Sequence, residues 1–210
     1  ELLSSADAVK SIVIEDMVQS MALKKDYGCL LGTGGQNQPL GIITASGVAG
    51  SAIGSLAIGT NGGNATFEHI KKILAKIEEQ NVSMEGVGLI MHSNVKNLLG
   101  LERISNYDLQ VTGGNYVMPN NPIVNDQLLQ NLIGYKIATS NQLPKNLVKG
   151  DSSDCSYIIG GNWREAMIGE WGGLSIAESS ENRFTTAETV LRVTTRMDFL
   201  LRHEEGFVIC

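Results

Sequence analysis

The chain has 210 residues, enough for one sizeable hydrophobic core or two small ones. Hydrophobic residues make up 42% and charged residues 18%, a balance that is typical of globular proteins and excludes a disordered or fibrous class. There are 16 Lys and Arg against 22 Asp and Glu, and the net charge of −6 is the opposite of what a protein that neutralises DNA phosphates usually carries. Strong direct nucleic-acid binding is therefore not expected.

The three cysteines, Cys29, Cys155 and Cys210, are far apart in the sequence and odd in number. They form neither a C-x-x-C pair nor a disulfide framework, which favours a reducing compartment. No apolar run reaches the roughly 18 residues that a membrane span needs, so no membrane segment is expected.

The first segment is predicted to be a long helix. Ser4 or Ser5 can cap its start, and lysines near its C-terminal end match the helix dipole. Gly28 is expected to end it. Its apolar residues recur at spacings of three and four, which predicts one apolar stripe: Ala6, Val9, Ile12, Val13, Met17 and Met21.

A glycine-rich stretch follows from Gly28 to Ile43, and residues 44–65 continue mainly in small side chains. Few large side chains are available there, so loop or weak strand is predicted rather than core. Thr66 is then predicted to cap a second helix from Phe67 to about Gln80. One apolar stripe marks its buried side: Phe67, Ile70, Ile73, Leu74 and Ile77.

Short elements are predicted through the middle of the chain. Ser93 can cap a helix that reaches Leu99. Residues 104–122 are polar and contain glycines and prolines, which favours a long surface loop. The other predicted elements are strands at 87–91, 135–139, 157–159 and 207–209 and a short helix at 125–131.

The last part of the chain predicts long strands. The runs 167–171 and 174–177 flank Gly172-Gly173, which predicts a hairpin. From Leu191 to Arg202 apolar and polar residues alternate, which predicts a strand with one buried face. Helices and strands mix without a regular β-α-β alternation, so the predicted fold class is α+β.

The stretch from Gly28 to Gly41 can be interpreted as a phosphate-binding loop or as a structural turn. A phosphate loop needs exposed backbone amides followed by a lysine and a hydroxyl at the start of a helix. Here the glycines come after a helix, and no Gly-Lys-Ser/Thr follows. Asn37 stands where a G-x-G-x-x-G motif needs its last glycine. A structural turn is therefore favoured.

No other group of residues indicates catalysis or metal binding. The three histidines show no zinc-ligand spacing, and the carboxylates of Asp151 and Asp154 are too few for a calcium loop. Cys155 has no histidine close in sequence that could activate it. No catalytic residue, cofactor or metal site is predicted.

Several sequence segments occur in a characteristic order. The first is the predicted long helix, followed by Leu30–Gly34 and Gln38–Ile42. The segments that follow are Gly86–His92, Ile133–Ile137, Ile159–Trp163, Gly172–Leu174, Phe184, Leu191–Arg202 and Gly206–Val208. In this order they resemble the major capsid proteins of tailed phages of the Hong Kong 97 type, over nearly the whole chain. The motif positions that the resemblance implies are structural rather than catalytic: Gly32, Gly34, Pro39, Gly41, Gly172, Gly173 and Phe184.

The resemblance implies a Hong Kong 97-like capsid fold with two domains. Residues 1–40 and 167–210 would form a peripheral domain with a long spine helix and closing strands. Residues 41–166 would form an axial domain with a mixed sheet and flanking helices.

The resemblance also implies a structural head protein of a phage or prophage, not an enzyme. Its copies would self-assemble into pentamers and hexamers of an icosahedral shell that encloses double-stranded DNA. Assembly would take place in the host bacterial cytoplasm and end in the virion capsid. Portal, scaffold or maturation protease would be partners of the full-length system.

The family's N-terminal arm and extended E-loop do not precede Glu1, so we expect the chain to be a fragment of a longer subunit. An encapsulin-type nanocompartment stays an alternative, because it shares this fold and fold alone does not separate the two. A small nucleotide-binding enzyme that uses the glycine-rich loop is the alternative of a different class.

Some members of this family join subunits covalently, by attack of a lysine on an asparagine while a buried glutamate takes the proton. The resemblance places Ala187 where that asparagine would be and Thr194 where the glutamate would be. Alanine has no carboxamide to attack, and threonine is no base near neutral pH, so we expect no such cross-link. A shifted alignment, which would involve Asn182 and Glu188, is the alternative.

Overall fold

The computed structural model describes residues 6–35, 37–45, 61–101, 133–179 and 189–210. The chain divides into two compact units, each made of segments that are far apart in the sequence. Unit 1 comprises Glu1–Gly41 and Met167–Leu200, and unit 2 comprises Ile42–Ala166 and Leu201–Cys210. The loop predicted over 104–122, the short helix predicted over 125–131 and Phe184 lie outside the described residues.

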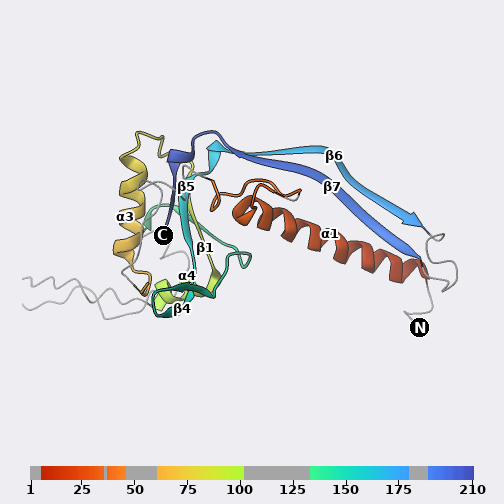
Figure 1. The fold of residues 1–210 in the computed structure, drawn as a ribbon, viewed down its shortest axis with the longest axis horizontal. Helices are drawn as coiled ribbons and strands as arrows, with labels where there is room; N and C mark the ends of the chain where they lie inside the picture. Colours follow the sequence, from red (N-terminus) through yellow and green to blue (C-terminus); the bar gives the residue numbers. More distant parts are fainter. Residues whose placement is uncertain (1–5, 36, 46–60, 102–132, 180–188) are drawn as a thin grey trace, which may run out of the picture. The chain divides into compact units, whose positions relative to one another are not determined.

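Unit 1 consists of one helix beside a two-stranded sheet (Figure 1). The helix α1 (Ala6–Leu31) has 26 residues, and the strands are β6 (Ala166–Ser179) and β7 (Val190–Leu201). Two ion pairs join α1 to β6: Lys10 with Glu178, and Lys25 with Glu170 at 2.7 Å. They lie near opposite ends of the helix, so α1 runs along the strands over most of its length.

The helix α1 does not end at Gly28, as the sequence predicted, but continues to Leu31. Gly28 is buried, and a Cβ atom there would lie 3.2 Å from Cγ of Pro39. Its carbonyl accepts the amide of Gly32 at 3.0 Å, as in an ordinary helical turn. Gly28 therefore serves close packing against the following turn rather than termination of the helix.

The hairpin predicted around Gly172-Gly173 is wrong. Both glycines lie inside the single 14-residue strand β6, although their φ angles are 76° and 62°. The partner of β6 is β7, a strand of 12 residues from a later part of the chain. A long partner stabilises a continuous strand, so the two glycines with positive φ are accommodated within β6 instead of forming a turn.

The alternation predicted for β7 is confirmed. Along the strand, Leu191 to Phe199 are at least half-buried at every second position, and the residues between them are exposed. Phe199 is 6% exposed, whereas its neighbour Leu200 is 60% exposed. The strand thus has one inner and one outer face, as period-two side-chain placement requires.

Unit 2 is built on a four-stranded mixed sheet with the order β2-β1-β5-β8. The pair β1–β2 is parallel, and β1–β5 and β5–β8 are antiparallel. The strands are β1 (Val87–Met91), β2 (Lys136–Thr139), β5 (Ile158–Asn162) and β8 (Phe207–Ile209). Beside the sheet lie α3 (Phe67–Glu78), α4 (Ser93–Leu101) and the strand pair β3 (Leu147–Lys149) and β4 (Ser152–Cys155).

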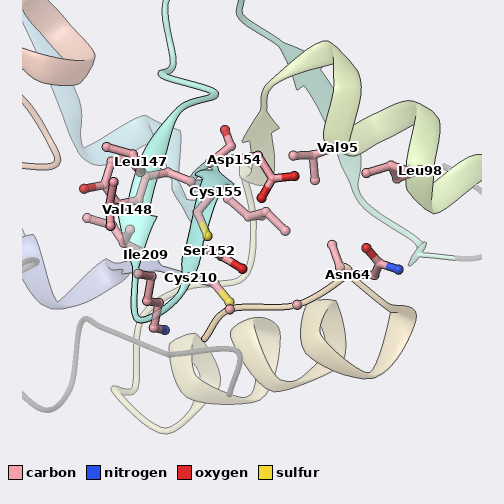
Figure 2. A pocket seen from close by; sticks show the side chains of 17 residues that line it. Asn64, Val95, Leu98, Leu147, Val148, Ser152, Asp154, Cys155, Ile209 and Cys210 are labelled. Atoms are coloured by element: carbon pink, nitrogen blue, oxygen red, sulfur yellow. The ribbon is translucent and has the colours of Figure 1, made fainter. Parts of the chain in front are cut away.

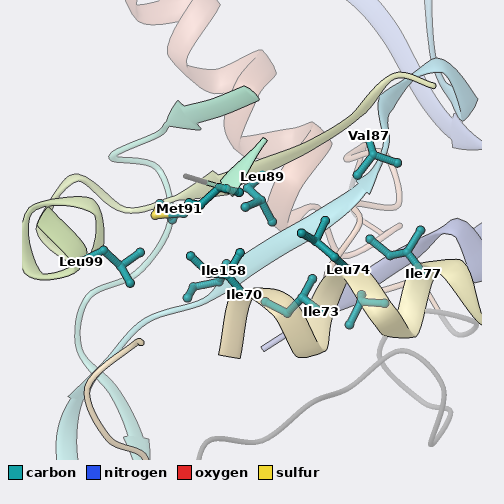
Figure 3. Packing of buried hydrophobic residues seen from close by; sticks show 11 residues of the cluster. Ile70, Ile73, Leu74, Ile77, Val87, Leu89, Met91, Leu99 and Ile158 are labelled. Carbon is teal, nitrogen blue, oxygen red and sulfur yellow. The ribbon is translucent and has the colours of Figure 1, made fainter. Parts of the chain in front are cut away.

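The core of unit 2 lies between α3 and the sheet. Figure 3 shows the α3 side chains Ile70, Ile73, Leu74 and Ile77 pointing toward β1 and β5. A Cβ atom at Gly160 of β5 would lie 2.5 Å from Ile73, so this glycine allows the helix to approach closely. The apolar stripe predicted for this helix is confirmed for these four residues, which are all buried.

The start of α3 is also as predicted. Thr66 adopts an extended backbone conformation, and its amide donates to Nδ1 of His69 at 3.2 Å. The Thr66 hydroxyl lies 2.7 Å from the same nitrogen. This capping box satisfies a backbone donor that the helix itself leaves free. His69 is therefore a half-buried capping residue.

The end of the chain departs from the expected division at 167–210, because Leu201–Cys210 belongs to unit 2. The strand β8 is fully buried and pairs with β5. Phe207 occupies the space that a side chain at Gly161 would need, since a Cβ there would lie 2.1 Å from its ring. The ring also makes an edge-on contact with Trp163 at a centroid distance of 5.5 Å. Three consecutive apolar residues without alternation need burial on both faces, which the sheet of unit 2 provides.

Candidate interaction surface

The glycine-rich motif folds into a tight turn at the end of α1. Thr33 and Leu40 form a β-bridge, and Gly34 donates its amide to the Pro39 carbonyl at 3.1 Å. Gly41 donates to the Gly32 carbonyl at 2.9 Å. The structure thus brings four of the predicted motif positions together: Gly32, Gly34, Pro39 and Gly41.

This turn does not form a phosphate cradle. The amides of Gly32, Gly34 and Gly41 all donate to backbone carbonyls of the turn or of α1, at 2.9 to 3.1 Å. A phosphate-binding loop needs such amides to be free and to point at the ligand. The geometry therefore supports the structural-turn interpretation over nucleotide binding.

The remaining motif positions are not part of this turn. Gly172 and Gly173 lie together within β6, and a Cβ atom at either one would have nothing within 4 Å. Their positive φ angles, rather than crowding, are what favours glycine there. Phe184 lies outside the described residues.

Unit 2 contains a pocket of about 530 Å³. Figure 2 shows side chains from α4, β3, β4 and the last strand around it, including Val95, Val148, Cys155 and Cys210. Burial raises the pKa of the Cys210 thiol to about 11, although Lys149 acts in the opposite direction. Cys210 is thus a protonated thiol at neutral pH and a poor nucleophile.

Polar side chains from β4 and the residues that follow it line part of the pocket. Asp154, Cys155 and Ser156 line it, but no histidine does in the part of the chain that the structure describes. Asp151, in contrast, lies in the β3–β4 turn, where its carboxylate accepts the Asn61 side-chain amide at 3.3 Å. The two carboxylates singled out in the sequence therefore do not form one site.

Metal binding has no support within the described ranges, where no group of three His, Cys, Asp or Glu side chains could hold an ion. His92 is buried and accepts the Asn94 amide on Nδ1 at 3.1 Å, which makes it a capping residue of α4. His203 is exposed and lies 3.9 Å from Glu165. Among the described helices, none combines the length and the apolar character needed to cross a membrane.

The most distinctive surface belongs to unit 1. Among the described residues, every exposed large hydrophobic side chain except Leu98 and Val148 is in this unit. Ile12 and Leu23 of α1 are 55% and 53% exposed, and Trp171 of β6 is 60% exposed. The others are Val13, Val18, Tyr27, Leu40, Met167, Ile168, Leu174, Ile176 and Leu200. This concentration of exposed apolar side chains makes unit 1 the candidate interaction surface of the chain.

This surface was not predicted from the sequence. Ile12 and Val13 belong to the apolar stripe predicted for α1, and the structure leaves both exposed. Two narrow strands cannot cover a 26-residue helix on more than one side. A signal was present, because Val18 and Leu23 lie outside the predicted stripe and make α1 apolar on several sides.

Comparisons with known proteins find that the chain is similar to phage capsid proteins. The model of the phage capsid family matches residues 1–210. The chain is 23% identical over 202 residues to the major capsid protein of Halomonas phage phiHAP-1, covering 96% of this chain and 28% of that protein. The chain therefore spans little more than a quarter of the length of that relative.

Solved structures show the same fold at low sequence identity. The capsid of an empty GTA particle superposes with a TM-score of 0.67 at 14% identity, covering 96% of this chain and 65% of that one. An encapsulin from Synechococcus elongatus superposes with a TM-score of 0.54 at 13% identity, covering 93% and 62%. Mixed α+β architecture is common to this chain and these shell proteins.

Proposed function

Because the chain belongs to the phage capsid family, we propose that it is the structural part of a major capsid subunit of a tailed phage or prophage. Copies of the subunit assemble into pentamers and hexamers of an icosahedral shell that encloses double-stranded DNA. The subunit acts in the virion shell and has no catalytic role. In the full-length system, portal, scaffold or maturation protease are its partners.

The observation that carries this proposal is the exposed apolar surface of unit 1. A protein that functions alone rarely leaves side chains such as Ile168 and Trp171 60% exposed on one small unit. A shell subunit needs such surfaces, because each copy contacts several neighbours. The net charge of −6 suits a container that does not adhere to the DNA inside it.

The finer assignment is a Hong Kong 97-like fold in which unit 1 is the peripheral domain and unit 2 the axial domain. Support comes from the long helix and long strands of unit 1 and from the mixed sheet of unit 2. The motif glycines fit a structural role, since Gly32 and Gly41 occupy positions without room for a side chain. The boundary near the C-terminus then lies at Leu200 and Leu201.

An encapsulin-type shell is the second candidate, favoured by the likeness to the Synechococcus elongatus encapsulin. Both functions need the same assembly surface, so the fold does not discriminate between them. The contents of purified particles discriminate between the two functions. Nuclease-protected double-stranded DNA supports the phage shell, and a protein cargo without DNA supports the encapsulin.

Sedimentation velocity of the gene product that contains this chain tests the assembly function. We expect large closed particles, and we expect Ile168→Asp with Ile176→Asp to shift the protein to slowly sedimenting species. Val148→Asp is the matched control, since Val148 is 76% exposed and also on a strand but belongs to unit 2. If the unsubstituted gene product stays monomeric at high concentration, the proposed function is wrong.

A further prediction of the proposed function is that mature particles are not covalently cross-linked by isopeptide bonds. Thr194, at the position of the family's glutamate, lies on the exposed outer face of β7, where a desolvated base would not form. Particles boiled in detergent and reductant should therefore migrate as single subunits on a gel. A ladder of multimers under these conditions would contradict the prediction.

A further inference from the structure

The two outward faces of unit 1 carry opposite charges. Lys10 and Lys25 pair with β6 residues, so their side of α1 is the side that faces the sheet. Ile12 and Leu23 lie about three turns apart on the opposite side, since a helix has about 3.6 residues per turn. Their exposure, 55% and 53%, agrees with this placement.

Carboxylates surround these two apolar side chains. Glu15 and Asp16 follow Ile12 by three and four residues, and Asp26 follows Leu23 by three. Residues at these spacings are neighbours on a helix surface, so the three carboxylates lie on the same side of α1 as Ile12 and Leu23. All three are exposed, and none forms an ion pair with another described residue. We call Ile12, Glu15, Asp16, Leu23 and Asp26 the acidic helix face.

The outer face of the β6–β7 pair is basic. Arg192 and Arg196 are exposed and alternate with the inward-facing residues of β7. On β6, Glu170 faces α1, so its neighbour Trp171 points outward, where its ring lies over Gly169. Within the described residues, neither arginine has an ion-pair partner. We call Trp171, Arg192 and Arg196 the basic ribbon face.

Other charges nearby do not cancel this pattern. On the ribbon, Asp198 is exposed on the same face as the two arginines, and its carboxylate accepts the Phe199 amide at 2.9 Å; its single negative charge leaves that face with a net positive charge. On the helix, the Lys24 ammonium lies over the Tyr27 ring at 5.7 Å from its centroid. Within the part of the chain that the structure describes, the helix face thus keeps its negative charge and the ribbon face a net positive charge.

We propose that the basic ribbon face of one copy docks on the acidic helix face of the next copy in the shell. This inference rests on the proposed function and names the partner surface of each subunit. The two faces lie on opposite sides of the same unit, so they meet only between copies. Each face combines exposed apolar side chains with a net charge, negative on the helix and positive on the ribbon, where two arginines stand against the single carboxylate of Asp198, as complementary interfaces do. A contact of two different faces runs head to tail, and such a contact produces closed rings such as pentamers and hexamers when the rotation between copies closes.

A charge-swap experiment tests this pairing in the complete gene product. The ribbon variant carries Arg192→Glu and Arg196→Glu, the helix variant carries Glu15→Arg and Asp16→Arg, and the swap variant carries all four substitutions. The measurement is the lowest protein concentration at which light scattering detects particles at fixed ionic strength. We expect each two-residue variant to need about tenfold more protein, because like charges then face each other at every contact. The swap variant should return to the unsubstituted concentration.

Lys71→Glu with Lys145→Glu is the matched control, since it makes the same charge change at two exposed positions of unit 2. Melting curves by circular dichroism check that each variant folds. If a variant is unfolded, Arg192→Gln with Arg196→Gln takes its place, and a smaller rise in the required concentration is expected. The pairing would be overturned if the swap variant still needed more protein to form particles than the unsubstituted protein. It would also be overturned if the control variant needed as much protein as the ribbon variant. In both cases the proposed function would still stand. If the unsubstituted protein formed no particles at all, the proposed function itself would be overturned.

Discussion

At Gly41 only a hydrogen atom fits between two segments of backbone. A Cβ atom there would lie 2.4 Å from the Gly32 amide nitrogen and 2.8 Å from the backbone of Leu30 and Leu31. Real Cβ atoms do not approach backbone that closely, so Gly41→Ala forces the turn away from α1. We expect a loss of about 1–3 kcal/mol in the free energy of unfolding, the usual cost of overpacking. Urea titration of the variant measures it.

Gly35→Ala is the control for this prediction. Gly35 lies in the same turn, but nothing is within 4 Å of a Cβ atom placed there. The substitution should leave stability nearly unchanged or raise it slightly, because alanine restricts the unfolded chain. Equal losses for Gly35→Ala and Gly41→Ala would show that the close approach is not what selects glycine.

Cys210 gives the protein a pH dependence in the alkaline range. Burial raises its pKa from 9.0 to about 11 in the folded chain, so the unfolded chain loses this proton first as the pH rises. The thiol contributes no pH dependence below about 9, and its contribution to stability falls between pH 9 and 11. We expect the melting temperature to drop more steeply over this range in the unsubstituted protein than in Cys210→Ala. Parallel curves for the two proteins would contradict the assignment.

Among the elements, β6 depends most on two residues. Gly172 and Gly173 both have positive φ angles within the strand, where a side chain meets no neighbour but the backbone is strained for an L-residue. Gly173→Ala should cost about 1–2 kcal/mol in the free energy of unfolding, Gly173→Asn less and Gly173→Val more. Urea titration of the three variants gives the order. Valine as stable as asparagine would mean that the backbone at this position is not left-handed.

Sequence patterns predicted the elements whose side-chain period matches their burial. The stripe from Ile70 to Ile77 and the alternation along β7 each face a single core, so their periods of 3.6 and 2 were informative. The sequence pattern predicted a hairpin where β6 is a continuous strand, because two adjacent glycines indicate a turn as long as the pairing with the distant strand β7 is unknown. It also failed at Gly28, whose neighbour Pro39 is brought close only by the fold. Pairing between distant segments decided both outcomes.

At the scale of the whole molecule, the two units differ in how they bury apolar side chains. Unit 2 contains the core between α3 and its sheet, whereas the buried hydrophobics described in unit 1 are Leu30 and Phe199. Sequence could not show this difference, because an apolar residue such as Ile12 looks the same whether it faces a core or a neighbouring subunit. The interaction surface could not be predicted from the sequence, since it depends on which side chains the fold leaves uncovered.

An electron cryomicroscopy map of particles formed by the complete gene product would show whether the exposed side chains of unit 1 lie at contacts between subunits. We expect closed icosahedral shells in which Ile12, Ile168 and Trp171, exposed in the single chain, are covered by neighbouring subunits. Shells in which these side chains still face solvent, or a protein that forms no shells, would contradict this expectation.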